Sequence, residues 1–415
     1  MMQFDRMTLG KKARELGFVR DTFEKVCRLA DVLDSIQKDE LLSNALALKG
    51  GTAINLTIFN LPRLSVDIDM DFSENVPREE MLAIRTQITE RISKYMTAAG
   101  YHLSQKSKTY HALDSFVYEY QNTGGMKDNL KIEINYMLRC HVLAPVRRTV
   151  NLPWLEQELT VLSVDPLEIY GSQIVALLNR AAPRDLYDIH TMMEYGLFDE
   201  SQEPMLKKCV MFYSAIGSDS VPDRFHFEQI ASVSQQRVKT DLIPVLRRGT
   251  WFDAQQAHEQ VIAYLGKLLI PDERELSFWT SFGQQEYRPE LLFQDADILA
   301  RIGQHPMALW KCSERSATAG RFTFQGGVQH GNHTPDASPH RQRPHGGTGH
   351  QRHHRLHRKS AKERRRAGQT GKAQRESAGG HSGQITRWQG CRLCALGDVV
   401  QPETDGTDGG LSAKP

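Results

Sequence analysis

The chain has 415 residues, of which 40% are hydrophobic and 25% are charged, and its formal net charge is +2. This length allows two or three domains with a sizeable core, and the near-neutral balance excludes an argument for nucleic-acid binding from overall charge. The charge is unevenly spread, because from Ser313 onward 17 Lys and Arg residues stand against 8 Asp and Glu. Residues 1–312 are therefore acidic, with a formal charge of −7.

Neither a signal peptide nor a membrane span is expected. The N-terminal residues lack an apolar stretch followed by small residues, and no apolar run approaches the length that spans a bilayer. Six cysteines in a chain of this length do not form a disulfide framework. We expect the four isolated ones to be buried or partly buried thiols, namely Cys27, Cys140, Cys209 and Cys312, and we treat the CxxC at Cys391 and Cys394 as a weak zinc signal. The protein is therefore expected to be reduced and cytoplasmic, with no membrane partner.

The first part of the chain predicts alternating helices and strands. Residues 21–36 place apolar side chains at helical spacing, and Asp21 with Glu24 matches a capping box. A short buried strand follows, then a helix that opens at Thr52 and ends at Pro62, and then a second strand. The two predicted strands are Leu46–Lys49 and residues 65–72.

The next part predicts one long helix and a strand pair. Pro77 starts an amphipathic helix with apolar residues on one face. Two strands with alternating apolar residues follow at 116–121 and 130–136. The segment between them is rich in Asn and Gly and therefore predicts a turn.

From Asp165 the pattern becomes helical. Pro166 stands in the first turn of a helix that runs to Arg180, and another helix follows Pro183. We expect an α/β (α+β) core with a mixed β-sheet, then a mainly helical domain, then a tail. The expected boundaries are 1–163, 164–312 and 313–415.

The tail from Ser313 onward differs in amino-acid composition from the rest of the chain. It is rich in Gly, His, Arg, Gln and Ser and poor in aliphatic residues, so we expect it to be disordered. It fits a basic arm for nucleic acid, a tail with no selected role, or an out-of-frame translation product. We favour the last, because the composition changes abruptly and a helical pattern stops after Cys312.

Two motifs around the second strand carry the chemistry. Gly50 and Gly51 let the backbone approach a ligand closely, and Thr52 lies at a helix N-terminus, where N–H groups favour a phosphate. Asp67 and Asp69 stand two residues apart and therefore share one face of a strand, about 7 Å apart. Their carboxylates suit Mg²⁺, which brings phosphate chemistry with it. The alternatives are an ordinary strand-to-helix turn and a solvated edge strand.

A third carboxylate is expected on a neighbouring strand. Glu133 lies between Ile132 and Ile134, so it projects opposite to two apolar side chains. Together with Asp67 and Asp69 it would support two metal ions and help to deprotonate an attacking hydroxyl. The alternative is the exposed polar face of an edge strand.

Three segments together resemble the AbiEii/AbiGii toxin family within the DNA polymerase β-like nucleotidyltransferase superfamily. They are LKGGTAINL with RLSVDIDMDF, IEINY, and NRAAPRDLYDI, and the ending HPMALWK also resembles these proteins. The resemblance stops at about residue 311. It implies a nucleotidyltransferase core and an enzyme that moves a nucleoside monophosphate from an NTP to an acceptor, with Mg²⁺ or Mn²⁺.

The resemblance also implies partners. Relatives include enzymes that act on tRNA ends, and AbiEii-type toxins are described as favouring GTP. We therefore expect an RNA or tRNA acceptor and a toxin of a toxin–antitoxin or abortive-infection phage-defence system. The expected partner is an antitoxin with a winged-helix region.

The resemblance assigns residues by their place in the motifs. The phosphate-binding turn corresponds to Gly50, Gly51 and Thr52, with Lys49 and Ser65 beside it, and the metal pair to Asp67 and Asp69 with Glu133. The later essential acid corresponds to Asp185. We expect Asp188 to serve helix packing or capping, and Arg184 to pair with a carboxylate.

One position departs from the family. Relatives commonly carry a lysine where this chain has Gln173, and glutamine cannot neutralise a triphosphate. Lys49 and Lys131 are candidate substitutes, although exposed lysines are more often simply solvated. Two other functions therefore stay open, a small-molecule (antibiotic-type) nucleotidyltransferase and a decayed, non-catalytic copy.

Overall fold

The computed structural model describes residues 5–152, 154, 158–218 and 220–313, all of which belong to one compact unit. Its centre is a mixed eight-stranded sheet, with the order β3-β5-β6-β2-β1-β8-β7 and with β4 paired to β5. The strands are β1 Leu46–Lys49, β2 Asp67–Phe72, β3 His102–Leu103, β4 Lys108–Thr109, β5 Leu113–Gln121, β6 Lys127–Asn135, β7 Val146–Thr149 and β8 Thr160–Ser163. The expected mixed α/β core is confirmed.

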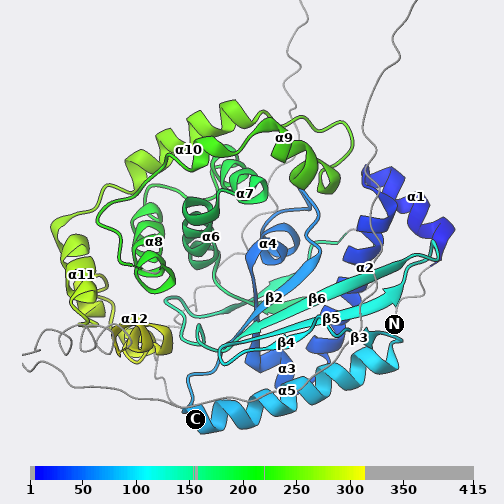
Figure 1. The fold of residues 1–415 in the computed structure, drawn as a ribbon, viewed down its shortest axis with the longest axis horizontal. Helices are drawn as coiled ribbons and strands as arrows, with labels where there is room; N and C mark the ends of the chain where they lie inside the picture. Colours follow the sequence, from blue (N-terminus) through cyan, green and yellow to red (C-terminus); the bar gives the residue numbers. More distant parts are fainter. Residues whose placement is uncertain (1–4, 153, 155–157, 219, 314–415) are drawn as a thin grey trace, which may run out of the picture. The chain divides into compact units, whose positions relative to one another are not determined.

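The helices divide between the two sides of the sheet. Helices α6–α8 and α10–α12 gather on one side, and α5 lies across the other (Figure 1). Those of the first half are α1 Arg6–Leu16, α2 Arg20–Gln37, α3 Glu40–Ala45, α4 Gly50–Ala53 and α5 Arg78–Ala98. Those of the second half are α6 Pro166–Arg180, α7 Pro183–Glu194, α8 Glu203–Gly217, α9 Gln235–Arg237, α10 Ala254–Leu268, α11 Glu273–Gly283 and α12 Ala296–Ile302.

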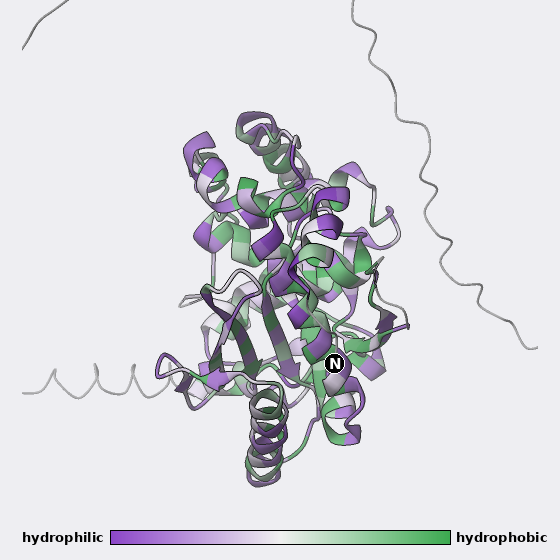
Figure 2. Cartoon of the chain, turned by 90° about the vertical axis from the view of Figure 1, so that its right-hand side faces the viewer, coloured by the Kyte–Doolittle hydropathy of each residue, from purple (hydrophilic) through white to green (hydrophobic). Residues whose placement is uncertain are grey.

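The four central strands, β8, β1, β2 and β6, combine parallel and antiparallel pairing. Strand β2 runs antiparallel to β1 and parallel to β6, while β8 runs parallel to β1. Parallel neighbours need crossovers, and the long helix α5 with the β5–β6 hairpin supplies the connection from β2 to β6. The helices are amphipathic, with hydrophobic and hydrophilic bands side by side in Figure 2.

Several sequence-based boundaries shift in the structure. Strand β2 starts two residues later than expected, and the β5–β6 strands are longer, with a shorter turn. The helix after the glycine turn begins at Gly50 rather than Thr52. It widens into a π-helical turn over Ile54–Ile58 and ends there, before Pro62. Leu61 then takes a left-handed conformation with φ of 51°.

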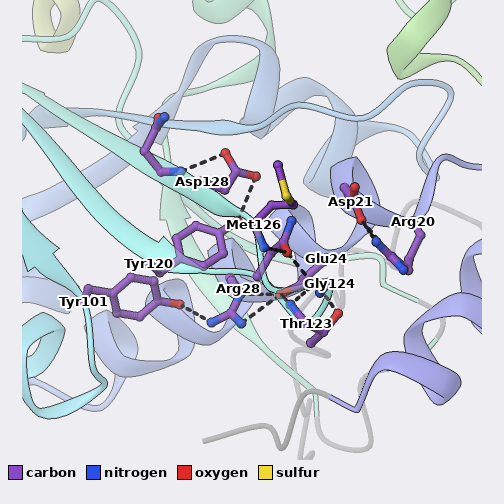
Figure 3. Close-up of polar contacts among 12 residues, drawn as sticks. Arg20, Asp21, Glu24, Arg28, Tyr101, Tyr120, Thr123, Gly124, Met126 and Asp128 are labelled. Atoms are coloured by element: carbon purple, nitrogen blue, oxygen red, sulfur yellow. Dashed lines mark hydrogen bonds and ion pairs between the residues drawn. The ribbon is translucent and has the colours of Figure 1, made fainter.

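The expected capping box at the start of α2 is wrong. The N-cap is Val19, whose side chain has no oxygen, and Asp21 pairs with Arg20 instead. Glu24 is fully buried and accepts from both Arg28 (Nε, 3.0 Å) and Thr123 (main-chain N, 3.0 Å). Figure 3 shows this carboxylate between α2 and the tip of the β5–β6 hairpin. A long-range pairing of a buried charge therefore overrides the local capping pattern.

Other sequence-based expectations concern the thiols, membrane and tail. Cys27, Cys140, Cys209 and Cys312 are buried, as expected. In the described part of the chain no helix is both long and apolar enough to cross a membrane. The expected disorder of the tail and the CxxC motif lie outside the described residues, and the boundary between residues 163 and 164 stays a prediction.

Candidate active site

The glycine turn between β1 and α4 is shaped by two different neighbours. Gly50 has φ of +64°, and a Cβ there would lie 3.2 Å from the Asp69 carboxylate. A Cβ on Gly51 would lie 2.6 Å from a terminal nitrogen of Arg63 and 3.3 Å from the Ser65 hydroxyl. Only glycine therefore allows the turn to lie this close to both β2 and Arg63.

The side chain of Thr52 holds the turn in place rather than facing a ligand. It is fully buried, and its hydroxyl donates to the main-chain carbonyl of Asp67 at 2.5 Å. The Thr52 hydroxyl is thus already used within the protein, and the groups that this segment leaves for a ligand are its backbone N–H groups. Ser65 is also buried and lies two residues before the start of β2.

Two neighbouring strands, β2 and β6, place acidic side chains beside one another. Asp67 and Asp69 alternate along β2, and strand pairing sets Asp69 opposite Lys49 on β1 and opposite Glu133 on β6. Residues directly opposite in neighbouring strands share a face of the sheet. The structure thus brings together the three carboxylates that the sequence analysis selected.

The Asp69 carboxyl is buried enough that the nearby positive charges do not keep its pKa low. Burial, with the charges of Asp67 and Glu133 adding to it, raises its pKa to about 6, although Lys49 and Lys131 oppose the rise. A divalent cation would reverse this effect, and oxygen-only donors are what Mg²⁺ prefers. The donor set therefore fits the expected metal.

The metal site is not already assembled by the protein alone. Within the described ranges, no three His, Cys, Asp or Glu side chains form a group that could hold a metal ion. Glu133 instead pairs with Lys131 at 2.8 Å, and Lys49 pairs with the buried Asp71 at 2.5 Å. Both lysines are therefore paired with carboxylates, and Lys131 lies against the Oε2 oxygen of Glu133.

A buried polar network connects the segment before β2 to helices α6 and α7. Arg63 donates two hydrogen bonds to Asp188, at 2.7 and 2.5 Å, and both side chains are buried. Arg180 donates two to Asp185, at 2.7 and 2.8 Å. The Nε2 amide of Gln173 lies between the two acids, 3.0 Å from Asp185 and 3.5 Å from Asp188.

This network explains what the glutamine does. Each aspartate already has an arginine partner, so Gln173 can bridge them without adding charge. Its amide faces these acids from α6, so a lysine there would place a third cation between the two carboxylates. Asp188 therefore serves as the partner of Arg63, and its role is packing by ion pair rather than helix capping.

Sequence analysis missed Arg63 and Arg180 and misjudged Arg184. Arg63 gave no signal, because its partner Asp188 lies 125 residues away. The side chain of Arg180 is 64% exposed, and its pKa is raised first by its hydrogen bond to Asp185, then by the Asp185 charge, with Asp69 adding to the rise. Arg180 is thus a largely exposed cation that interacts electrostatically with Asp69. Arg184 donates to the main-chain carbonyl of Asp241 rather than to a carboxylate.

Comparison with known proteins finds one matching family and solved structures of similar fold. The family model described as "Nucleotidyl transferase AbiEii toxin, Type IV TA system" matches residues 31–259, which include the glycine turn, the carboxylates and the α6–α7 network. Among solved structures, MenT4, a nucleotidyltransferase toxin from Mycobacterium tuberculosis H37Rv, aligns with a TM-score of 0.52 at 19% identity. The alignment covers 72% of this chain and 99% of MenT4 and shows a shared fold. No curated protein sequence matches the chain.

Proposed function

Because the chain belongs to the AbiEii family of nucleotidyltransferase toxins of type IV toxin–antitoxin systems, we propose that it moves a nucleoside monophosphate from an NTP to a hydroxyl of an RNA acceptor and releases pyrophosphate. The observation that carries the proposal is the raised pKa of Asp69, which lies beside Asp67 and Glu133 under the glycine turn. Such a concentration of carboxylates is costly without a cation. Mg²⁺ or Mn²⁺ bound there would neutralise the triphosphate and lower the pKa of the attacking hydroxyl.

Residues of the chain itself bind the phosphates, neutralise their charge and accept the proton. The N–H groups of Gly50 and Gly51 bind a phosphate, and Arg180 neutralises part of its charge from the opposite side. Glu133 accepts the proton of the acceptor hydroxyl. Lys131 remains beside the carboxylates and limits their mutual repulsion.

The proposed partners follow the family. We take the acceptor to be RNA or tRNA and the donor to be GTP, and we expect a cognate antitoxin with a winged-helix region. The side chain of Arg180 stays exposed although it pairs with Asp185, which suits the triphosphate of the NTP donor.

Transfer of label tests the proposal directly. The full chain is incubated with Mg²⁺, total RNA and each α-³²P-labelled NTP in turn, beside Asp67→Asn and the control Glu119→Gln, which changes an exposed acid on β5. We expect labelled RNA from the parent and the control and a loss of at least about 10³-fold with Asp67→Asn. Equal labelling by Asp67→Asn would refute the metal-dependent mechanism, and absence of label with every NTP from a folded parent would refute the RNA acceptor.

A further inference from the structure

Helix α1 carries an exposed basic face that none of the chemistry above uses. Its buried side is formed by Leu9 and Ala13, and its exposed cations are Arg6, Lys11, Lys12 and Arg14. Three of them line one hollow together with Arg20 at the start of α2. Among the described residues none of the four α1 cations forms an ion pair.

The segment around α1 has few acidic residues to offset these cations. Asp5 accepts from Thr8 as the N-cap, which leaves Glu15 as the other acidic side chain of this segment. Four cations against these two acids contrast with the formal charge of −7 over residues 1–312. The positive charge on α1 is therefore a local concentration on an acidic body.

A second segment extends this face. The main-chain N–H of Arg248 donates to the carbonyl of Gly17 at 2.6 Å, and the Arg247 guanidinium lies 5.2 Å from the Phe18 ring. Trp251 follows and is 74% exposed. We use the name basic surface for Arg6, Lys11, Lys12, Arg14, Arg247, Arg248 and Trp251. Figure 2 looks onto the side of the molecule on which α1 lies.

The basic surface is attached to the segment that leads into the carboxylates. Arg247 donates to the main-chain carbonyls of Asn60 and Leu61, both at 3.2 Å, and the N–H of Leu64 donates to Val245 at 2.8 Å. From Leu61 the chain needs six residues to reach Asp67, which is at most about 20 Å. A chain-like ligand bound to the basic surface could thus reach the site within a few monomers.

We propose that the basic surface binds the sugar–phosphate backbone of the RNA acceptor and that Trp251 stacks on one of its bases; this rests on the proposed function. The catalytic carboxylates repel phosphate, so the free energy for holding an RNA must come from another surface. Exposed cations without ion-pair partners suit a phosphate backbone, and an exposed indole suits an unpaired base. Within residues 1–312 we therefore expect the salt dependence of RNA binding to arise at the basic surface rather than at the carboxylates.

Two matched triple variants of the full chain test the proposal. One reverses charge on the basic surface, Lys11→Glu, Lys12→Glu and Arg14→Glu. The other makes the same change at three exposed lysines elsewhere, Lys94→Glu, Lys106→Glu and Lys108→Glu, which also form no ion pair with described residues. Because the basic tail is common to both, differences between them report the surface alone.

Binding is measured by fluorescence anisotropy with labelled total tRNA from 50 to 300 mM KCl, without NTP. We expect the basic-surface variant to bind at least about 10-fold more weakly than the control variant. We also expect its slope of log affinity against log salt to be smaller by about 2 to 3. Trp251→Ala should weaken binding about 5- to 100-fold with an unchanged slope, whereas Trp310→Ala should have little effect.

The outcomes separate this proposal from the transfer proposal. Equal affinities and slopes for the two triple variants would overturn the RNA surface, even if the parent labels RNA. Loss of tRNA binding in the basic-surface variant alone would support it, even if the parent transfers no nucleotide. Unchanged tRNA binding together with lost neutralisation by a co-expressed antitoxin would assign the surface to a protein partner and overturn the proposal.

Discussion

The buried pair of Arg63 and Asp188 offers the sharpest test of how this site is held together. Asp188→Asn keeps the shape of the side chain but removes its charge, so the fully buried Arg63 guanidinium loses its counter-charge. Breaking a buried pair from one side costs about 3–5 kcal/mol, because an uncompensated charge stays behind. A domain is stable by only about 5–15 kcal/mol. The variant should therefore lose a large part of its free energy of unfolding.

The measurement is urea unfolding followed by far-ultraviolet circular dichroism. Asp34→Asn serves as the control, because it breaks the exposed pair with Lys38 and should cost less than about 1 kcal/mol. The double variant Arg63→Met, Asp188→Leu removes both charges and should recover most of the loss. A cost below about 1 kcal/mol for Asp188→Asn, or no recovery in the double variant, would refute the reasoning.

Three further predictions follow from single positions. Gln173→Lys adds a cation beside the two aspartates of the network and should lower KM for the NTP about 10-fold; an unchanged KM in steady-state transfer assays would contradict this. Gly51→Ala would bring a Cβ to 2.6 Å from Arg63 and should cost about 1–3 kcal/mol in urea unfolding. By contrast Gly266→Ala, in an open helical position, should stabilise by about 0.5–1 kcal/mol. Burial lowers the pKa of His305 to about 3, so below about pH 6.5 the unfolded chain binds a proton that the folded one does not. The free energy of unfolding should therefore fall by about 1.4 kcal/mol per pH unit towards pH 4, and His305→Leu should show a slope shallower by about that amount in unfolding titrations.

The sequence by itself determined the local pieces of this protein. Alternation placed Asp67 and Asp69 on one face of β2, and Pro166 and Pro183 stand at the starts of α6 and α7, as expected. Gly50 and Gly51 marked the turn between β1 and α4. These features follow from the period of a strand or a helix and from the conformational limits of proline and glycine, all of which act over a few residues.

Only the tertiary structure decided which groups meet. Strand register set Glu133 opposite Asp69, and the pairing of Arg63 with Asp188 spans 125 residues. The same kind of long-range contact drew Glu24 away from the expected capping box. A buried charge must find a partner wherever the fold supplies one, and a local pattern carries no information about where that is. The partner of each charge in this site was therefore settled by burial and packing rather than by sequence spacing.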